Sequence, residues 1–190
     1  TYEAKSLPYP IDTSYYDNEK HTQADALSVI PFMDEMNYEG LSVSGLSDGY
    51  YGLTIGREFI GRFTARELER GINMALLQNT PQYKQAMKIR QMNEERWLKE
   101  RKMREFYWVE YNLMRKTGML WACDEAAVDT LRKYRPHDIF LQWNGDLWLQ
   151  YMHKGIREDC VNEQQDLVDR IYEQNKPIPL QIEIKKFTDL

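Results

Sequence analysis

Residues 81–116 read PQYKQAMKIRQMNEERWLKERKMREFYWVEYNLMRK. Thr80-Pro81 ahead of this stretch and Gly118 after it are the residue types that open and close helices. A helix of this length would extend about 50 Å, which exceeds the width of a compact domain of this size. Its middle is mostly charged, which is typical of a helix that crosses solvent or lies along another protein. The stretch therefore predicts a long projecting helix over 81–117.

The residues after this helix predict a small helical core. Asp124 is a residue type that caps helices, and it precedes an amphipathic stretch that ends near Tyr134. Residues 139–151 are open to two interpretations, because an apolar helical stripe competes with Asn144-Gly145, a dipeptide typical of β-hairpin turns. The helix is favoured, since the apolar residues on either side of the dipeptide do not alternate.

Residues 158–174 predict a further helix, which Pro177 ends. The C-terminal segment differs, because Ile178, Leu180, Ile182 and Ile184 alternate with polar residues or proline. This period of two indicates a strand with one apolar face. No clear partner strand is visible in the sequence. The strand is therefore expected either to join the sheet of another protein or to pack as an extended tail on this chain's own helices.

The N-terminal part lacks a clear period. Prolines and a Gly/Ser-rich stretch interrupt it, and only residues 23–30 predict a short helix. Thr64-Ala65-Arg66-Glu67 has the form of a capping box and predicts a helix over 65–78. The fold class expected is mainly α, with extended N- and C-terminal arms. The three predicted parts are an irregular arm over 1–63, a helical domain over 64–176 and an extended arm over 177–190.

The composition excludes several functions. The formal net charge of −5 argues against nucleic acid as a partner. No stretch approaches the about 18 apolar residues of a membrane span, so we expect no transmembrane segment. The three histidines have no metal-ligand spacing, and the two cysteines are expected to be free, buried thiols. No catalytic, cofactor-binding or metal-binding residue is predicted, and the chain is not expected to be an enzyme.

Several short motifs resemble segments of one protein family. They lie within about residues 45–109 and comprise Gly45-Leu46-Ser47, Gly49-Tyr50, Leu53, Ile55-Gly56, Glu67-Leu68-Glu69-Arg70, Ile72, Ala75-Leu76-Leu77-Gln78, Asn93-Glu94-Glu95 and Trp108-Val109. Their order resembles the retinoid–interferon-induced-mortality accessory subunit of mitochondrial complex I. That family has a membrane-spanning helix after the Gly-Tyr segment, where this chain carries Arg57, Glu58 and Arg62. The resemblance implies a mitochondrial inner-membrane location.

The first functional hypothesis is a non-catalytic accessory subunit of a large multi-protein assembly, such as a respiratory or ATP synthase complex of the mitochondrial inner membrane. Ordering two long arms costs about 1–2 kcal/mol per residue, and a partner surface would offset this cost. The partners expected are other protein subunits, and a cytoplasmic location is the alternative. The candidate partner-binding residues are Tyr9, Tyr15, Tyr16, Tyr50, Tyr51, Trp97, Ile178, Leu180, Ile182 and Ile184.

An alternative hypothesis is an all-α soluble enzyme or ligand-binding domain. Its aromatic-lined pocket would be formed by Trp121, Trp143, Trp148 and Tyr151. A coiled-coil scaffold ranks last, because the apolar residues of the long helix do not keep a heptad.

Overall fold

We describe the fold from a computed structural model, which covers residue 2, residues 4–11 and residues 22–187. The described chain is predominantly helical with two small sheets, so the mainly α prediction is confirmed at that level. The helices are η1 (Gln23–Ser28), α1 (Phe32–Glu35), α2 (Ala65–Arg70), η2 (Met74–Leu76), α3 (Pro81–Val109), η3 (Glu110–Met114), α4 (Glu125–Tyr134), η4 (Arg135–His137), α5 (Ile139–Tyr151) and α6 (Lys154–Gln174). The strands are β1 (Gly40–Leu41), β2 (Tyr50–Ile55), β3 (Glu58–Thr64), β4 (Ile72–Asn73) and β5 (Ile182–Lys186).

The chain divides into two compact units. The sheet unit comprises Thr1–Arg90 and Tyr172–Leu190, and the helical unit comprises Gln91–Ile171. Both α3 and α6 have residues in each unit. The domain boundaries predicted from the sequence remain a prediction, which limited proteolysis would test.

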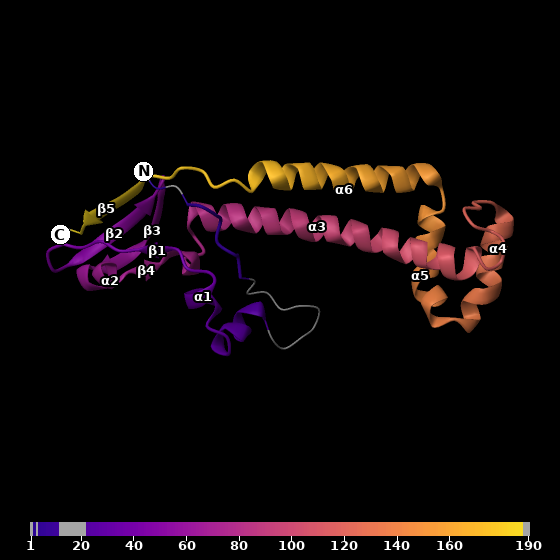
Figure 1. The fold of residues 1–190 in the computed structure, drawn as a ribbon, viewed down its shortest axis with the longest axis horizontal. Coiled ribbons are helices and arrows are strands. Elements are labelled where there is room, and N and C mark those ends of the chain that lie inside the picture. The colour runs from indigo at the N-terminus through magenta and orange to yellow at the C-terminus, as the bar shows by residue number, and fades with distance from the viewer. Residues whose placement is uncertain (1, 3, 12–21, 188–190) are drawn as a thin grey trace. The chain divides into compact units, whose positions relative to one another are not determined.

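The sheet unit contains a three-stranded antiparallel sheet in the order β3-β2-β5. In Figure 1 the yellow C-terminal strand β5 lies beside the violet β2, although the two are far apart in sequence. Leu53 pairs with Ile184, and Ile55 pairs with Ile182. The expectation of a strand without a partner in this chain, or of a tail packed on helices, is therefore wrong. The partner strand escaped notice because glycine and threonine interrupt the apolar pattern of β2.

One face of the sheet forms the core of this unit. Leu53 and Ile55 are completely buried, as is Met74 from the turn η2. Ile182 and Ile184 of β5 pack against the same cluster. Burial of such aliphatic side chains contributes about 1.5–3 kcal/mol each. The segment expected to be an irregular arm over 1–63 therefore supplies the central strand β2 and most of the edge strand β3, which corrects that expectation.

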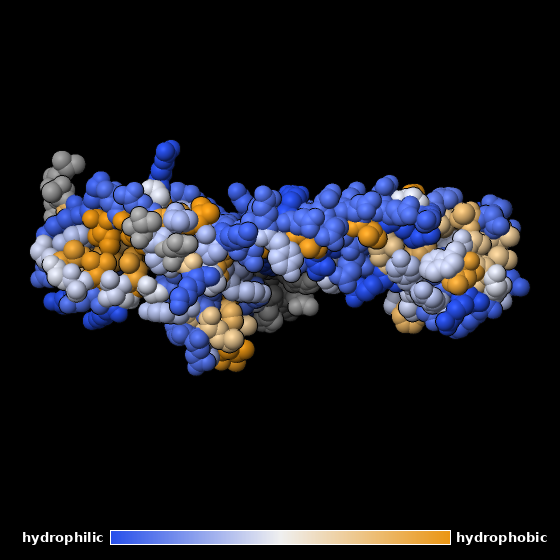
Figure 2. All heavy atoms as spheres, turned by 45° about the horizontal axis from the view of Figure 1, so that its top comes forward, coloured by the Kyte–Doolittle hydropathy of each residue, from blue (hydrophilic) through white to orange (hydrophobic). Residues whose placement is uncertain are grey.

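The opposite face of the sheet carries an exposed aromatic patch, which we define as Tyr50, Phe59 and Phe187 with Arg62. The rings of Phe59 and Phe187 meet edge to face with centroids 6.3 Å apart, directly over Gly52. A Cβ atom at Gly52 would lie 3.2 Å from both rings. The Arg62 guanidinium lies 3.8 Å from the centroid of the Tyr50 ring. Figure 2 shows hydrophobic residues gathered on the surface of the sheet unit.

The capping box at Thr64 is confirmed. The Thr64 hydroxyl accepts from the Glu67 backbone N–H, and the Glu67 carboxylate accepts from the Thr64 backbone N–H at 2.7 Å. The helix that follows is shorter than the predicted 65–78, because it ends at Arg70. Gly71 then adopts a φ of 93°, which other residues rarely adopt, and the chain turns into β4.

The helical unit packs α4 and α5 around the end of α3. Its buried cluster includes Phe106, Val109, Leu131 and Trp148, all at most 1% exposed. The predicted helix start at Pro81, the Asp124 N-cap and the helix over 139–151 are confirmed. A predicted helix over 158–174 begins four residues earlier, at Lys154. Of the two free cysteines, Cys160 is buried as expected, but Cys123 is exposed.

Among the described helices, none combines the length and the apolar content needed to cross a bilayer.

Candidate functional site

The most unusual backbone of the helical unit follows α3. Residues Glu110–Met114 form a π-helical turn, in which the Arg115 N–H donates to the Glu110 carbonyl at 2.8 Å. Such turns are rare and are frequent at functional sites. The chain then reverses through Gly118 and reaches Trp121, whose φ is 64°. Trp121 is the one non-glycine residue with positive φ in the described part of the chain, and a bulky residue adopts this conformation only when its surroundings impose it.

Glu110 imposes the conformation of Trp121. Its carboxylate is 1% exposed, and its two oxygens accept different hydrogen bonds. Oε2 accepts from the Trp121 backbone N–H at 3.0 Å, and Oε1 accepts from the indole Nε1–H of the buried Trp148 at 2.8 Å. Hydrogen bonds to a buried charged acceptor are stronger than those between neutral groups. One carboxylate therefore joins the π-helical turn, the strained residue and the centre of the core.

Three aromatic side chains gather beside this turn. The ring centroid of Trp121 lies 6.1 Å from that of Tyr107 and 5.9 Å from that of Tyr111, and both contacts are edge to face. All three rings are exposed, Trp121 at 45%. An exposed cluster of rings held by a buried hydrogen-bond network is typical of a binding surface.

A groove with a volume of about 510 Å³ lies against this cluster. Its lining comes from the end of α3, the loop before α4 and the first turns of α6, and comprises Tyr107, Trp121, Lys154, Arg157, Glu158, Val161 and Asn162. The volume falls in the range of about 300–1,000 Å³ that is usual for small-molecule sites. Aromatic walls with a few polar groups are the usual composition of such sites.

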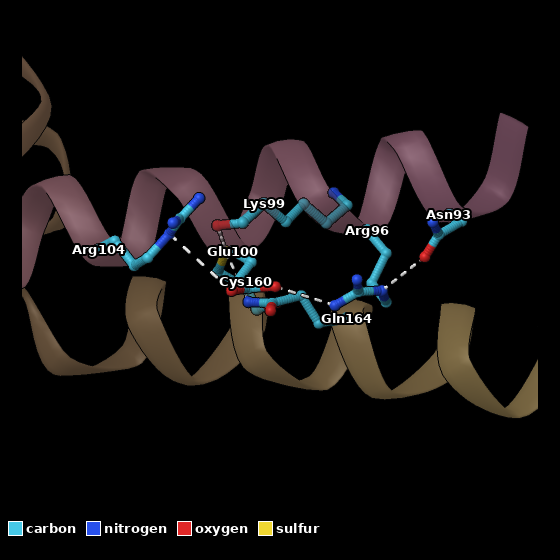
Figure 3. Close-up of polar contacts among 7 residues, drawn as sticks. All are labelled: Asn93, Arg96, Lys99, Glu100, Arg104, Cys160 and Gln164. Atoms are coloured by element: carbon cyan, nitrogen blue, oxygen red, sulfur yellow. Dashed lines mark hydrogen bonds and ion pairs between the residues drawn. The ribbon is translucent and has the colours of Figure 1, made fainter. Parts of the chain in front are cut away.

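The contact between α3 and α6 sets the position of the polar groups in the groove. Figure 3 shows the two helices side by side, with the Cys160 thiol 3.9 Å from the Lys99 carbonyl oxygen. The Lys99 ammonium also donates to the Glu163 carboxylate at 2.6 Å. This hydrogen bond raises the pKa of Lys99 and lowers the pKa of Glu163. Because this contact fixes the register of the helices, the first turns of α6 lie beside Phe106 and Tyr107.

Arg157 is the most constrained polar group in the groove. Its Nη1 donates to the carbonyls of Tyr151 and Met152 at 2.7 and 2.6 Å. The guanidinium carbon lies 4.7 Å from the centroid of the Phe106 ring and 5.9 Å from that of Trp121. Arginine commonly stacks in this way on aromatic faces. The groove thus presents a positioned cation between aromatic walls.

Two further cavities occur in the helical unit. One of about 430 Å³ is lined by residues that include Trp108, His137 and Asp138, and one of about 350 Å³ includes Trp97 and Arg104. Neither combines a buried carboxylate with strained backbone. No group of three or more metal-ligating side chains occurs within residues 2, 4–11 and 22–187.

The structure places the aromatic residues of the alternative hypothesis in different surroundings. Trp121 lines the groove, whereas Trp148 and Tyr151 are buried in the core. Trp143 is 66% exposed and contacts Phe140. The four residues therefore do not line a common cavity in the described chain.

The predicted partner-binding residues differ in their exposure to solvent. Those with the largest exposure are Tyr9, Tyr50, Trp97 and Ile178, at 37–56%. Tyr51 is buried, and Leu180, Ile182 and Ile184 pack against the sheet core. Tyr15 and Tyr16 lie outside the described residues. Their partner-binding role stays a prediction.

Sequence reasoning missed Glu110, Tyr107, Arg157 and Lys154. The spacing of Tyr107 and Tyr111, one helical turn apart, is a local signal for adjacent rings. Nothing in the sequence indicates the π-helical turn. The burial of the carboxylate also escapes prediction, because its hydrogen-bond donor Trp148 lies 38 residues away.

Comparison with known proteins gives two matches. Residues 87–176 match the family model described as the diltiazem deacetylase C-terminal helical domain. The solved structure of BT4096, described as a gut microbial diltiazem-metabolizing enzyme, is similar with a TM-score of 0.88 and 38% sequence identity. The similarity covers 97% of this chain, and the chain spans 42% of the length of that protein. No curated protein matches the chain.

These matches overturn several expectations. The resemblance to the accessory subunit of mitochondrial complex I is wrong, because both matches are to diltiazem-metabolizing proteins. The non-catalytic respiratory or ATP synthase subunit, its hetero-oligomeric partners and the mitochondrial location are wrong for the same reason. The expectation that the chain is not an enzyme is contradicted by the same two matches. Charged helices of different families share short motifs, because their residue types are dictated by solvent exposure.

Proposed function

We propose that this chain takes part in the enzymatic removal of acetyl groups from aromatic, drug-sized esters, and that its aromatic groove binds the ring portion of the substrate. The observation that carries the proposal is the similarity to the diltiazem-metabolizing enzyme, at 38% identity over 97% of this chain. The match of residues 87–176 to a deacetylase helical domain supports it, because these residues supply the whole lining of the groove.

The geometry of the groove supports a binding role. Trp121 and Tyr107 provide rigid ring surfaces, and stacking of an aromatic ligand against such rings contributes about 0.5–1.5 kcal/mol beyond area burial. Glu110 holds the Trp121 backbone before any ligand arrives. A preformed wall avoids the free-energy cost of ordering a side chain on binding, about 0.5–1.5 kcal/mol.

We also propose the finer architecture that the sequence predicts. In it, the charged middle of α3 projects from a small helical core, and this core carries the groove. Limited proteolysis with mass spectrometry would test whether the groove residues remain protected as one fragment.

The test is to measure both diltiazem binding, by isothermal titration calorimetry, and acetate release by the purified protein. We expect saturable binding that Trp121→Ala weakens about tenfold, which corresponds to about 1.4 kcal/mol. Any effect on turnover should appear in KM more than in kcat, because the ring contact is made equally in the bound substrate and the transition state.

Trp143→Ala is the matched control, because Trp143 is also an exposed tryptophan of the helical unit but does not line the groove. It should bind diltiazem as the unmodified protein does. The proposal is wrong if the unmodified protein shows no saturable binding, or if both variants lose affinity equally.

A further inference from the structure

We infer that the groove selects aromatic ligands that carry an oxygen acceptor next to the ring, an ester carbonyl or, more strongly, a carboxylate, and that Arg157 is the residue that binds this oxygen. The inference rests on the proposed function for the use of the groove as a ligand site. It adds the chemical class of the group that is recognised and the residue that recognises it.

The side-chain charges in the groove do not balance. Lys154, Arg157 and Glu158 are its charged side chains. The Lys154 ammonium lies 3.2 Å from a Glu158 carboxylate oxygen, so these two charges compensate each other. Within the described residues, no carboxylate lies within ion-pair distance of Arg157. The groove therefore keeps one positive charge that no side chain neutralises.

Arg157 has hydrogen-bonding capacity that the protein does not use. A guanidinium carries five N–H donors in a rigid plane. In the structure, Nη1 donates to the two backbone carbonyls at the end of α5. Nε–H and the two N–H groups of Nη2 have no acceptor among the described residues. These remaining donors form one edge of the fork that recognises carboxylate and carbonyl oxygens.

The neighbours of Arg157 hold this donor edge in place. The carbonyls of Tyr151 and Met152 anchor one side of the guanidinium, and its carbon lies 4.7 and 5.9 Å from the ring centroids of Phe106 and Trp121. Its side chain is half-buried, so the charge is less screened by water than that of a surface arginine. A fixed donor edge loses little conformational entropy when it binds an oxygen.

The guanidinium of Arg157 lies next to the aromatic walls of the groove. The same Trp121 ring that contacts Arg157 also contacts Tyr107, and both aromatic residues line the groove. A ligand that stacks on these rings brings a substituent of its own ring close to the guanidinium. An oxygen acceptor there would gain a charge-assisted hydrogen bond, whereas an ammonium group would meet the uncompensated charge of Arg157.

The experiment compares three probes of one shape by isothermal titration calorimetry with the full chain. The probes are 2-naphthoate, methyl 2-naphthoate and 2-naphthylmethylammonium. We expect 2-naphthoate to bind at least about tenfold more tightly than the ammonium probe, with the ester between them. The affinity for 2-naphthoate should fall as salt is raised from about 0.05 to 0.5 M, because salt screens the ionic contact.

Arg157→Gln should remove the preference for 2-naphthoate and leave the affinity for the ester within about threefold. Arg157→Lys should keep part of the preference, because it retains the charge without the planar fork. Arg115→Gln is the matched control. Arg115 lies over the Tyr111 ring but does not line the groove, so this change should leave the preference for 2-naphthoate unaltered. Circular dichroism melting of each variant reports whether loss of the carbonyl contacts unfolds the protein.

The inference is overturned if the unmodified protein binds the ammonium probe as well as 2-naphthoate, a result that needs no variant. It is also overturned if a folded Arg157→Gln protein keeps the full preference. Failure of the proposed function would give a different result. In that case the unmodified protein would bind no diltiazem, whichever naphthalene probe it prefers.

Discussion

The sheet unit and the helical unit bury their centres in different ways. At the centre of the sheet unit, Leu53 and Ile55 are completely buried among aliphatic side chains. At the centre of the helical unit, the carboxylate of Glu110 is almost as deeply buried, and it accepts from Trp148 and Trp121. An apolar centre tolerates changes that conserve volume, whereas a buried carboxylate is stable only while its hydrogen-bond donors remain in place.

The two centres also differ in how they connect to the surface. The polar centre of the helical unit reaches the surface through Trp121, whose side chain lines the groove. The aliphatic centre of the sheet unit lies on one face of the three-stranded sheet. A buried polar network therefore links the stability of the helical unit to the wall of the groove.

The largest effect is expected for Glu110→Ala. It removes the acceptor for two hydrogen bonds to a buried charge and leaves the Trp148 indole N–H without a partner, so the free energy of unfolding should fall by about 3–5 kcal/mol. Hydrogen exchange should accelerate in α4 and α5 while β2 stays protected. Glu110→Gln, which keeps one good acceptor oxygen, should lose about half as much. Equally accelerated hydrogen exchange in β2 would show that the two buried centres are not independent.

Leu53→Ala is the reciprocal test in the sheet unit. Truncation of a completely buried leucine costs about 2–4 kcal/mol through lost burial and the cavity left behind. Denaturant unfolding should show this loss, and hydrogen exchange should accelerate in β2, β3 and β5 but not in α5. The neighbouring half-buried Thr54, changed to alanine, is the control. A similar loss for Thr54→Ala would contradict the assignment of the core face.

A smaller effect is expected at the start of α2. Thr64→Ala removes the hydroxyl that accepts from the Glu67 N–H, and loss of such a cap costs about 1 kcal/mol. Thr130→Ala changes the same residue type within α4 of the helical unit, where the hydroxyl only bonds back to the Ala126 carbonyl. That control should be neutral or slightly stabilising, because alanine favours helices. Thermal melting of both variants decides between these outcomes.

The smallest effect concerns Tyr2, whose hydroxyl donates to a Glu39 carboxylate oxygen at 2.8 Å. Partial burial and this hydrogen bond raise the pKa of Tyr2 to about 12. A raised pKa stabilises the fold fully below the unfolded value of about 10, and the contribution is lost as the pH rises through about 12. Tyr2→Phe should therefore lower the melting temperature slightly at pH 8, and the difference from the unmodified protein should shrink above pH 10. A difference that grows above pH 10 would contradict the contact.

The strongest local signals determined several helices from the sequence alone. The capping box at Thr64, the Asp124 N-cap and the Thr80-Pro81 start each depend on residues within about four positions of one another. Such interactions form in the same way whatever the rest of the chain does. The predominantly helical class follows from the same local patterns.

The sheet and the groove were decided by tertiary structure. The period of two at Ile182 and Ile184 predicted a strand, but its pairing with β2 joins residues about 130 positions apart, and no local pattern encodes that contact. Glu110, Trp121, Trp148 and Arg157 likewise come from separate segments that helix packing brings together. The sequence alone therefore determined which segments become helices or strands, because those preferences are local. Only the folded chain decided which faces meet, because burial and hydrogen bonding depend on neighbours that are distant along the chain.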